Sequence, residues 1–300
     1  MTQQTPKISV IIGTYNQCSI LQKVLPYYEH QSAKPESFEV VVVDSTSNDG
    51  SVEFLKSYKP NFQFSYKIQE NNGKAGARNT AAKLAKGTVL LITDADMIPG
   101  ENFIQGHIDA HQNATKPACF EGLAWNLKTL DFPPDPATLS PQVGRHPGHM
   151  TRLGWYYFLT GNISIPTDLF WANNGFDESF KGYGWEDLEL GYRLSKQKVP
   201  LYYLKTAVNY HYHVISVEDE IERNEEKGKS ALMLLRLHPE LKWFLGLNPI
   251  SCYVFPRISK NSKLYAFFEN TCYQSKYKLL KNIGTWFLKE HRYLTGALKK

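Results

Sequence analysis

Cysteines are few in this sequence and widely scattered. Four occur among its 300 residues, at Cys18, Cys119, Cys252 and Cys272. They form no C-x-x-C pair and show no metal-ligand spacing, which excludes a disulfide framework and a zinc ribbon. Uninterrupted apolar runs such as Val40–Val43 are far too short to cross a bilayer. The first ten residues also lack the basic and then apolar layout of a secretion signal. We therefore expect a cytoplasmic protein.

The composition, 42% hydrophobic and 21% charged, excludes a disordered or fibrous chain. The net charge of +5 is mild but unevenly placed. Residues 242–300 hold eleven Lys and Arg against two Glu, a local charge of +9, so the rest of the chain carries −4. Such a tail favours an anionic partner or simply keeps the protein in solution. No DNA- or RNA-binding motif accompanies the charge, so we do not expect nucleic acid as a partner.

The first hundred residues alternate between the periodicities of strands and helices. Strands are predicted at Ile8–Gly13, Glu39–Asp44, Phe64–Ile68 and Val89–Thr93. Helices are predicted between them at Ser19–His30, Gly50–Tyr58 and Lys74–Lys86. This alternation predicts an α/β fold with a mainly parallel sheet and helices on both of its faces.

The next hundred residues are less regular. A Pro- and Gly-rich stretch at 128–149 is expected to be a long loop. Later elements are predicted as strands at Gly161–Pro166, Leu201–Leu204 and Ala207–Tyr212, and as helices from Thr167 and over Trp185–Lys196. The chain from about Val217 onward is predicted to be helical.

Residues that follow the predicted strands are candidates for a ligand site, because open parallel sheets bind ligands beyond the carboxyl ends of their strands. These positions are Thr14, Tyr15, Asp44, Asp94, Ala95 and Asp96. Carboxylates such as those of Asp94 and Asp96 suit Mg²⁺ or Mn²⁺. Taken alone, however, a D-x-D pair is explained at least as well by a helix cap and a solvated side chain.

An ordered set of motifs favours the ligand site. In the first half these motifs are Ile8-Ser-Val-Ile-Ile-Gly-Thr-Tyr-Asn16, Val41-Val-Val-Asp44, Asn72-Gly73, Gly76-Ala-Arg-Asn79 and Thr93-Asp-Ala-Asp96. They resemble the nucleotide-sugar half of family-2 glycosyltransferases, which have the GT-A fold. In the second half they are Gly161-Asn-Ile-Ser-Ile-Pro166, Asn174-Gly-Phe-Asp-Glu178 and Gly182-Tyr-Gly-Trp-Glu-Asp-Leu-Glu189. These resemble the C-terminal segment of galactosyl- and N-acetylgalactosaminyltransferases.

The resemblance covers about residues 7–215 and implies the domain organisation. Residues 1–215 would form a Rossmann-like GT-A catalytic domain, with a nucleotide-sugar half at 1–100 and an acceptor half at 101–215. Residues 216–300 match no family and would form a helical C-terminal extension rich in basic and aromatic residues.

The resemblance also implies how a UDP-sugar would bind. Thr14 and Tyr15 would line the base pocket, and Asp44 would accept a hydrogen bond from uracil. Family members usually carry a second acidic residue after that aspartate, and this sequence has Ser45 there instead. Arg78 and the backbone around Gly73 would face the diphosphate at a helix N-terminus, which favours anions.

The metal and the catalytic groups are implied in the same way. Asp94 and Asp96 would border a bound Mn²⁺ or Mg²⁺, and Asp94 and Ala95 would also contact the nucleotide-sugar. A histidine from a late strand would complete the site, and His211 is favoured over His213, which shares its face of the strand.

The helix predicted to begin near Trp185 would supply the base. Asp187 would take the proton of the acceptor hydroxyl, and Glu186 would hold sugar hydroxyls. Three further residues would contact the acceptor, namely Tyr183, Trp185 and Asn162. The reaction implied is inverting transfer from a UDP-α-sugar to a carbohydrate or lipid-linked glycan, forming a β-linkage.

Two other functions compete with this one. A sugar-nucleotide nucleotidyltransferase would need a Gly-rich, cationic loop after the first strand, where this sequence has no cation until Lys23. A catalytically inactive sugar-binding scaffold is the second, and the intact acidic motifs argue against it. The aromatic and basic tail leaves two interpretations open: peripheral contact with a membrane, or a helical cap packed on the catalytic domain.

Overall fold

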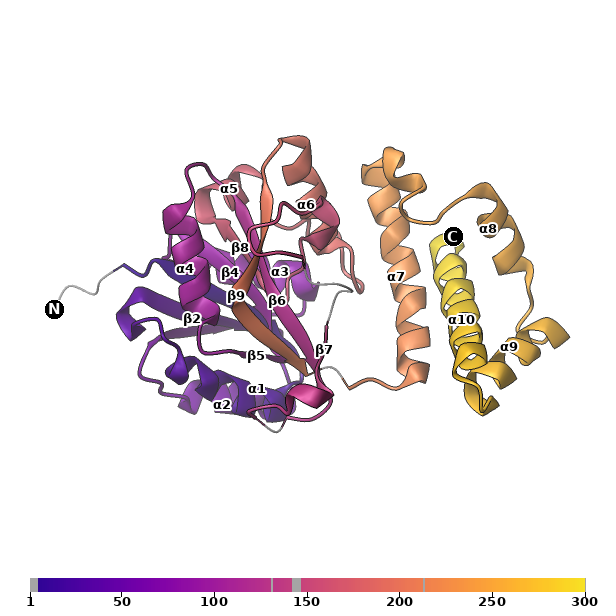
Figure 1. Ribbon diagram of the computed structural model, residues 1–300, viewed down its shortest axis with the longest axis horizontal. Helices are drawn as coiled ribbons and strands as arrows, with labels where there is room; N and C mark the ends of the chain where they lie inside the picture. The colour runs from indigo at the N-terminus through magenta and orange to yellow at the C-terminus, as the bar shows by residue number, and fades with distance from the viewer. Residues whose placement is uncertain (1–4, 131, 142–146, 213, 300) are drawn as a thin grey trace. The chain divides into compact units, whose positions relative to one another are not determined.

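The computed structural model describes residues 5–130, 132–141, 147–212 and 214–299, and it divides into two compact units. The first unit comprises Met1–Glu178 and Glu186–Val214. The second comprises Ser179–Trp185 and Ile215–Lys300. A short segment from the middle of the chain thus belongs to the C-terminal unit (Figure 1).

The first unit is built on one mixed sheet, which in the described residues has nine strands. The strands are β1 (Ile8–Thr14), β2 (Phe38–Asp44), β3 (Gln63–Ile68), β4 (Val89–Asp94), β5 (Met97–Pro99), β6 (Cys119–Leu127), β7 (Ser140–Pro141), β8 (Ile163–Pro166) and β9 (Leu201–Tyr212). Their order is β3-β2-β1-β4-β8-β6-β9-β5, and β7 pairs with β6. Strands β3, β2, β1 and β4 are parallel, whereas β8 runs antiparallel to both of its neighbours.

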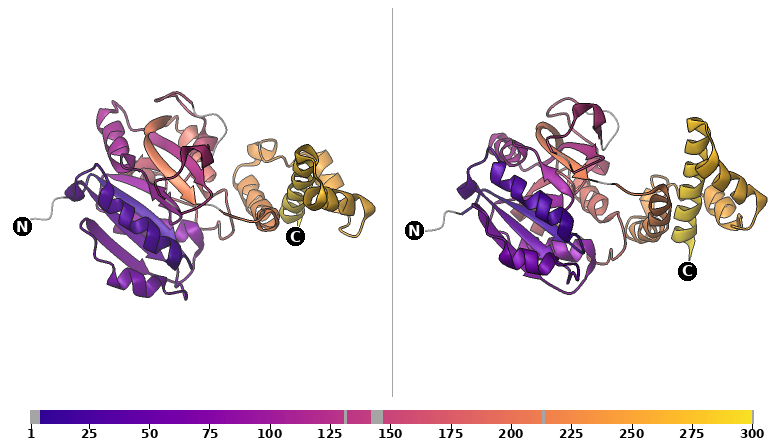
Figure 2. Two further views of the ribbon diagram at one scale, coloured as in Figure 1. Left: turned by 60° about the horizontal axis from the view of Figure 1, so that its bottom comes forward. Right: turned by 90° about the horizontal axis from the view of Figure 1, so that it is seen from below.

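Helices cover both faces of this sheet (Figures 1 and 2). The α-helices of the first unit are α1 (Cys18–Val24), α2 (Ser51–Ser57), α3 (Gly73–Leu84), α4 (Phe103–Asn113), α5 (Thr167–Ala172) and α6 (Glu186–Lys196). Its 3₁₀ helices are η1 (Leu25–His30), η2 (Pro35–Ser37), η3 (Pro136–Thr138) and η4 (Trp155–Tyr157).

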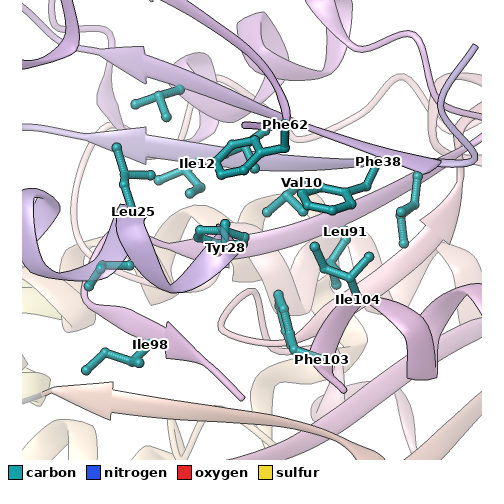
Figure 3. Close-up of a cluster of buried hydrophobic side chains, with 14 of the residues drawn as sticks. Val10, Ile12, Leu25, Tyr28, Phe38, Phe62, Leu91, Ile98, Phe103 and Ile104 are labelled. Carbon is teal, nitrogen blue, oxygen red and sulfur yellow. The ribbon is translucent and has the colours of Figure 1, made fainter. Parts of the chain in front are cut away.

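The alternation along β2 shows how the two cores arise. Val40 and Val42 pack into the cluster formed with α1, η1 and α4, part of which is shown in Figure 3. Val41 and Val43 point the other way, into the cluster formed with α3, α5 and α6. A strand buried on both faces must be apolar throughout, because successive side chains point to opposite faces. The carboxyl ends of β1, β2 and β4 are therefore held at one edge of a rigid sheet.

The structure confirms the α/β fold and the first four predicted strands. It differs from the sequence predictions farther along the chain. The strands predicted at 201–204 and 207–212 are one strand, β9, whose register against β6 shifts at Gly122 and Leu123. Helix α4 and strand β6 were not predicted, and the stretch at 128–149 contains η3 and β7 among its described residues.

The second unit is helical, as predicted. Its elements are α7 (Val217–Leu237), η5 (Pro239–Lys242), α8 (Pro249–Val254), η6 (Phe255–Arg257), α9 (Lys263–Gln274) and α10 (Lys278–Leu298). Its core includes Ile221 of α7, Tyr265 of α9 and Phe287 of α10. Among the described residues, no helix combines the length and the hydropathy that crossing a membrane requires.

A buried histidine pair links α4 to β8 and to the residue before it. His107 is within 2.8 Å of the Asn162 Oδ1 and within 2.7 Å of the Ser164 Oγ, and His111 also contacts that hydroxyl, at 2.8 Å. The Asn162 amide nitrogen donates to the Leu123 and Ala207 carbonyls. The Asn162 oxygen therefore accepts from His107, and a neutral imidazole satisfies both of its partners. Burial lowers the pKa of His107 to about 4.

We predict that this pair makes the fold sensitive to acid. In the unfolded chain His107 takes up a proton near pH 6.5, but in the folded chain only near pH 4. The unfolded state therefore binds more protons as the pH falls between these values, and His107 alone lowers the free energy of unfolding by about 3 kcal/mol. Urea unfolding at several pH values measures this loss. His107→Gln should make the unfolding free energy less dependent on pH, whereas His30→Gln on the surface should leave its pH dependence unchanged. Parallel wild-type and His107→Gln curves would contradict the prediction.

Candidate active site

The loops after β1 and β2 are bonded to each other. The Asn16 backbone N–H donates to the Ser47 hydroxyl, and the Asn48 N–H donates to the Asn16 side-chain oxygen. Ser47 in turn donates its backbone N–H and its hydroxyl to the two oxygens of buried Asp44, at 2.8 and 2.6 Å. Asp44 therefore shapes its loop, and its contact with uracil stays a prediction.

The residues predicted to line the base pocket lie at the end of β1. The Thr14 side chain is buried, whereas half of Tyr15 is exposed at the start of the following loop. An exposed ring held by a rigid loop is available to stack on a nucleobase.

Arg78 of α3 joins the two acidic motifs. It is 2% exposed, and its Nη2 donates to the Asp94 Oδ1 at 2.6 Å while its Nη1 donates to the Glu186 Oε1 at 2.8 Å. Burial acts to lower the pKa of Arg78, but the charges of Asp94 and Glu186 outweigh burial and raise it. The sequence predicted that Arg78 faces the diphosphate. In this structure the guanidinium is buried and bonded to protein carboxylates, and its contact with a diphosphate stays a prediction.

The next residue, Asn79, fixes a second loop to the same helix. Its amide oxygen accepts the Phe176 N–H at 3.0 Å, and its nitrogen donates to the Phe176 carbonyl and to the Glu178 carboxylate. The loop before α6 is thereby tied to α3. Its motif alone did not predict this role for Asn79.

The start of α3 carries a cation that the sequence analysis overlooked. Gly73 adopts φ +78°, a conformation that glycine accepts readily, and it begins the helix. Lys74 follows it, and the charge of Asp94 is the main cause that raises the pKa of Lys74, with Glu186 and Asp96 contributing. The sequence did contain a signal for this cation. Lys74 lies in the first turn of a predicted helix, one turn before Arg78.

Of the D-x-D residues, Asp94 ends β4, while Ala95 and Asp96 form the short connection to β5. Ala95 is buried in the core, while the Asp96 Oδ2 lies 3.5 Å from the His211 Nε2. The Asp96 Oδ1 is buried and lacks a hydrogen-bond partner among the described residues. For Asp94, burial raises the pKa, but the Lys74 and Arg78 cations outweigh it and lower the pKa to about 2.

A divalent cation fits part of this donor set. Two ligands at right angles on one ion about 2.1 Å away lie about 3 Å apart, close to the separation of the Asp96 and His211 atoms. The unpartnered Asp96 oxygen is a further donor. Asp94 is engaged by Arg78, and His213 lies outside the described residues. In the part of the chain that the structure describes, no three His, Cys, Asp or Glu side chains form a metal cluster. Asp96 and His211 are therefore the protein ligands that fit.

The acidic pair opens α6. Glu186 is buried, and its Oε2 has no hydrogen-bond partner in the described residues. The Asp187 Oδ1 accepts the N–H of Leu188 at 2.8 Å. Burial, reinforced by the negative charge of Glu186, raises the pKa of Asp187 to about 7. A carboxylate with such a pKa is suited to remove a proton near neutral pH.

The three residues predicted to contact the acceptor lie in different surroundings. Asn162 is fully buried in the sheet, and both atoms of its amide are bonded to protein groups. Its contact with the acceptor stays a prediction. Tyr183 and Trp185 belong to the second unit: the Arg223 guanidinium lies over the Tyr183 ring, and the Trp185 indole N–H donates to the Lys227 carbonyl.

Two regions of the sequence match models of known protein families. Residues 9–161 match the model for glycosyl transferase family 2, and residues 148–215 match a model described as the N-terminal domain of galactosyltransferase. The chain belongs to glycosyl transferase family 2. It is 31% identical over 274 residues to validoxylamine A glucosyltransferase of Streptomyces hygroscopicus subsp. limoneus, covering 80% of this chain and 58% of that protein. Identity to the Pasteurella multocida hyaluronan synthase is 24%, covering 74% of this chain and 26% of that one.

This family member also shares its fold with solved structures. The mannosyltransferase PcManGT from Pyrobaculum calidifontis, in complex with GDP-Man and Mn²⁺, gives a TM-score of 0.62 at 17% identity, covering 98% of this chain and 86% of that one. S. aureus TarS 1–349 in complex with UDP-GlcNAc gives 0.57 at 17% identity, covering 97% and 90%. The chain spans about three fifths of the length of the first curated relatives that it matches.

We predict that Arg78 is essential to the stability of the first unit. Arg78→Ala leaves the buried Glu186 and the partly buried Asp94 without their cation, which costs about 3–5 kcal/mol of unfolding free energy. Arg78→Lys should lower the unfolding free energy by nearly as much, because an ammonium does not bridge two carboxylates as a planar guanidinium does. Lys229→Ala, which removes an exposed ion pair with Glu226, should cost no more than about 1 kcal/mol. Denaturant unfolding measures all three, and equal losses for Arg78→Ala and Lys229→Ala would refute the prediction.

Proposed function

We propose that this glycosyl transferase family 2 chain transfers a sugar from a UDP-sugar to a hydroxyl group of a carbohydrate or lipid-linked glycan, inverting the anomeric carbon to give a β-linkage. The observation that carries the proposal is the Arg78 bridge, which fixes the D-x-D motif and the Glu186–Asp187 pair in one site. The relatives named as glucosyltransferases and the UDP-GlcNAc complex of TarS support sugar transfer with a uridine nucleotide.

The donor would bind at the carboxyl edge of the sheet. Thr14 and the exposed Tyr15 ring would contact the base, and Asp44 would accept a hydrogen bond from it. The N-terminus of α3 at Gly73 would bind the diphosphate through its N–H groups and helix dipole. Lys74, in the first turn of the same helix, would add its positive charge to that of Arg78.

Asp96 and His211 would hold Mn²⁺ or Mg²⁺. When bound, such an ion neutralises the negative charge that develops on the departing nucleotide diphosphate. Asp94 contributes through Arg78: its carboxylate keeps the guanidinium in place and so orients Glu186.

Asp187 would act as the base. A sugar hydroxyl is a weak nucleophile, and a positioned base contributes about 10²–10⁴-fold to its reaction. As the hydroxyl oxygen attacks the anomeric carbon, its proton passes to the Asp187 carboxylate, and the nucleotide leaves from the opposite face. This single displacement inverts the anomeric carbon. The unpartnered oxygen of Glu186 would accept a hydrogen bond from a sugar hydroxyl, and Tyr183 and Trp185 would contact the acceptor.

We also propose that the enzyme works at the surface of a membrane, because one of its two acceptor classes is carried on lipid. This proposal concerns the place of the reaction and does not alter its chemistry.

Metal dependence is predicted from Asp96 and His211. EDTA should abolish transfer, and added Mn²⁺ should restore it. Asp96→Ala should remove activity and leave thermal unfolding unchanged, because Asp96 holds no buried cation of the protein. Asp109→Ala, an exposed carboxylate on α4, serves as the control and should be fully active. UDP release from a UDP-sugar measures the activity, and full turnover of the wild type in EDTA would overturn the prediction.

The base is tested by Asp187→Asn, which keeps the size and polarity of the helix start but cannot take a proton. Transfer should fall by about 10²–10⁴-fold, with little change in UDP-sugar affinity measured by calorimetry. Donor affinity lost in parallel with turnover would show that Asp187 is structural.

The pH profile provides a second test of Asp187. Because the base must be ionised and its pKa is raised to about 7, kcat/KM of the wild type should be level above pH 7 and fall about tenfold per pH unit below it. The small residual activity of Asp187→Asn should not show this fall. The same fall in both proteins would contradict the assignment.

A further inference from the structure

The segment just before α6, residues 182–185, lies along one face of α7, and both belong to the helical unit. The Arg223 guanidinium lies over the Tyr183 ring, 5.6 Å from its centre, and the Lys227 Nζ lies 5.7 Å from the centre of the Trp185 ring. The Trp185 indole N–H also donates to the Lys227 carbonyl at 2.9 Å. The segment is therefore held by side chains and by the backbone of the helix.

Two glycines let the segment approach α7 closely. A Cβ at Gly182 would lie 3.0 Å from the Ser230 hydroxyl, and one at Gly184 would lie 3.7 Å from the Lys227 Cγ. Residues three and four apart on a helix are neighbours, so Arg223, Lys227 and Ser230 form one face. We call these three residues the α7 face.

The backbone of Trp185 is strained. Its φ is +76°, in the left-handed region that bulky side chains rarely adopt, and it follows Gly184 at φ +85°. Such a conformation persists only where surrounding contacts hold it, and it is most often found at functional sites. The next residue, Glu186, begins α6 and accepts a hydrogen bond from the Arg78 guanidinium at 2.8 Å. The peptide between Trp185 and Glu186 is therefore held on both of its sides.

Neither packing nor contact with an acceptor accounts for this arrangement. A segment that only covered α7 could do so with a relaxed backbone and without the indole hydrogen bond. The indole N–H is the one polar group of the ring, and it is already bonded to the Lys227 carbonyl. The strain lies instead at the residue whose direction sets the first turn of α6, where Asp187 is found.

We propose that Trp185 and Lys227 are positioning residues for the reaction: by holding the indole, the α7 face fixes the direction of the first turn of α6 and so the place of the Asp187 carboxylate. The inference deepens the proposed function and rests on it for the role of Asp187. Placement matters because a base removes a proton only within hydrogen-bond distance of the hydroxyl, so that a displacement of about 1 Å costs up to about 10²-fold in rate.

Amide hydrogen exchange of the full chain, followed by mass spectrometry without substrate, tests the positioning. Trp185→Phe removes the N–H donor and keeps a ring. Residues 186–190 should then exchange about 2–10-fold faster, the factor that corresponds to one lost hydrogen bond. Trp243→Phe makes the same substitution at a ring that is 73% exposed in the same unit, and residues 186–190 should exchange as in the wild type. Unchanged exchange in Trp185→Phe, or equal acceleration in both variants, would overturn the proposal.

Lys227 provides an independent change. Lys227→Ala leaves the carbonyl in place but removes the cation over the ring, so residues 186–190 should exchange about 2–5-fold faster. Lys227→Arg keeps a cation over the ring and should exchange as the wild type. Lys229→Ala, on another side of the same helix, is the control and should leave this exchange unchanged. Faster exchange confined to α7 in Lys227→Ala would show that Lys227 only stabilises the helical unit, which contradicts the proposal.

UDP release from UDP-glucose or UDP-GlcNAc measures the consequence for catalysis, with water in place of the acceptor hydroxyl. Trp185→Phe should lower kcat about 10–100-fold. Calorimetry should show unchanged donor affinity and stoichiometry, so that the loss is not a loss of folded protein. An unchanged kcat, or donor affinity lost in parallel, would overturn the positioning role. A wild type that hydrolyses no UDP-sugar would instead refute the proposed function, and the exchange experiment would still decide whether Trp185 positions α6.

Discussion

The contact of Arg78 with Asp94 and Glu186 is the constraint on which the site depends. A buried guanidinium with two carboxylates is costly to desolvate, and it persists only where hydrogen bonds satisfy its charge. The three residues come from α3, the end of β4 and the start of α6, which are distant in the sequence. By joining them, these ion pairs fix the start of α6 to the edge of the sheet where β4 ends.

Much of the first half could be predicted because its strands are apolar on both faces. The run Val40–Val43 is apolar at every position and is therefore stable only in the interior of a sheet that is covered on both faces. The same holds for β1 and β4. Helix α4 and strand β6 were missed because polar residues interrupt their patterns. His107 and Glu121 are buried in the fold and bonded to residues far along the chain, and no local pattern reveals such partners.

The same reason limits what the sequence reveals about Arg78 and Asn162. Arg78 near a diphosphate motif and Asn162 beside an acceptor motif are plausible ligands when each is considered with its neighbours in sequence. Their partners, Glu186 for one and His107 for the other, are supplied only by the folded chain. The roles of Asp96, Asp187 and His211 stay predictions; Asp96 follows β4, Asp187 lies in the first turn of α6, and His211 lies near the end of β9.

The path of the chain between its two units has a consequence for how this protein can be divided. Residues 179–185 belong to the helical unit, where Trp185, at φ +76°, is bonded to α7, and the very next residue begins the helix that carries the acidic pair. No single cut therefore separates a complete catalytic unit from a complete helical one. A fragment ending at residue 214 would keep Glu186 and Asp187 but would strip the preceding segment of its packing partners. The helical unit therefore cannot be removed by a single truncation that leaves every segment of the chain with its own packing partners.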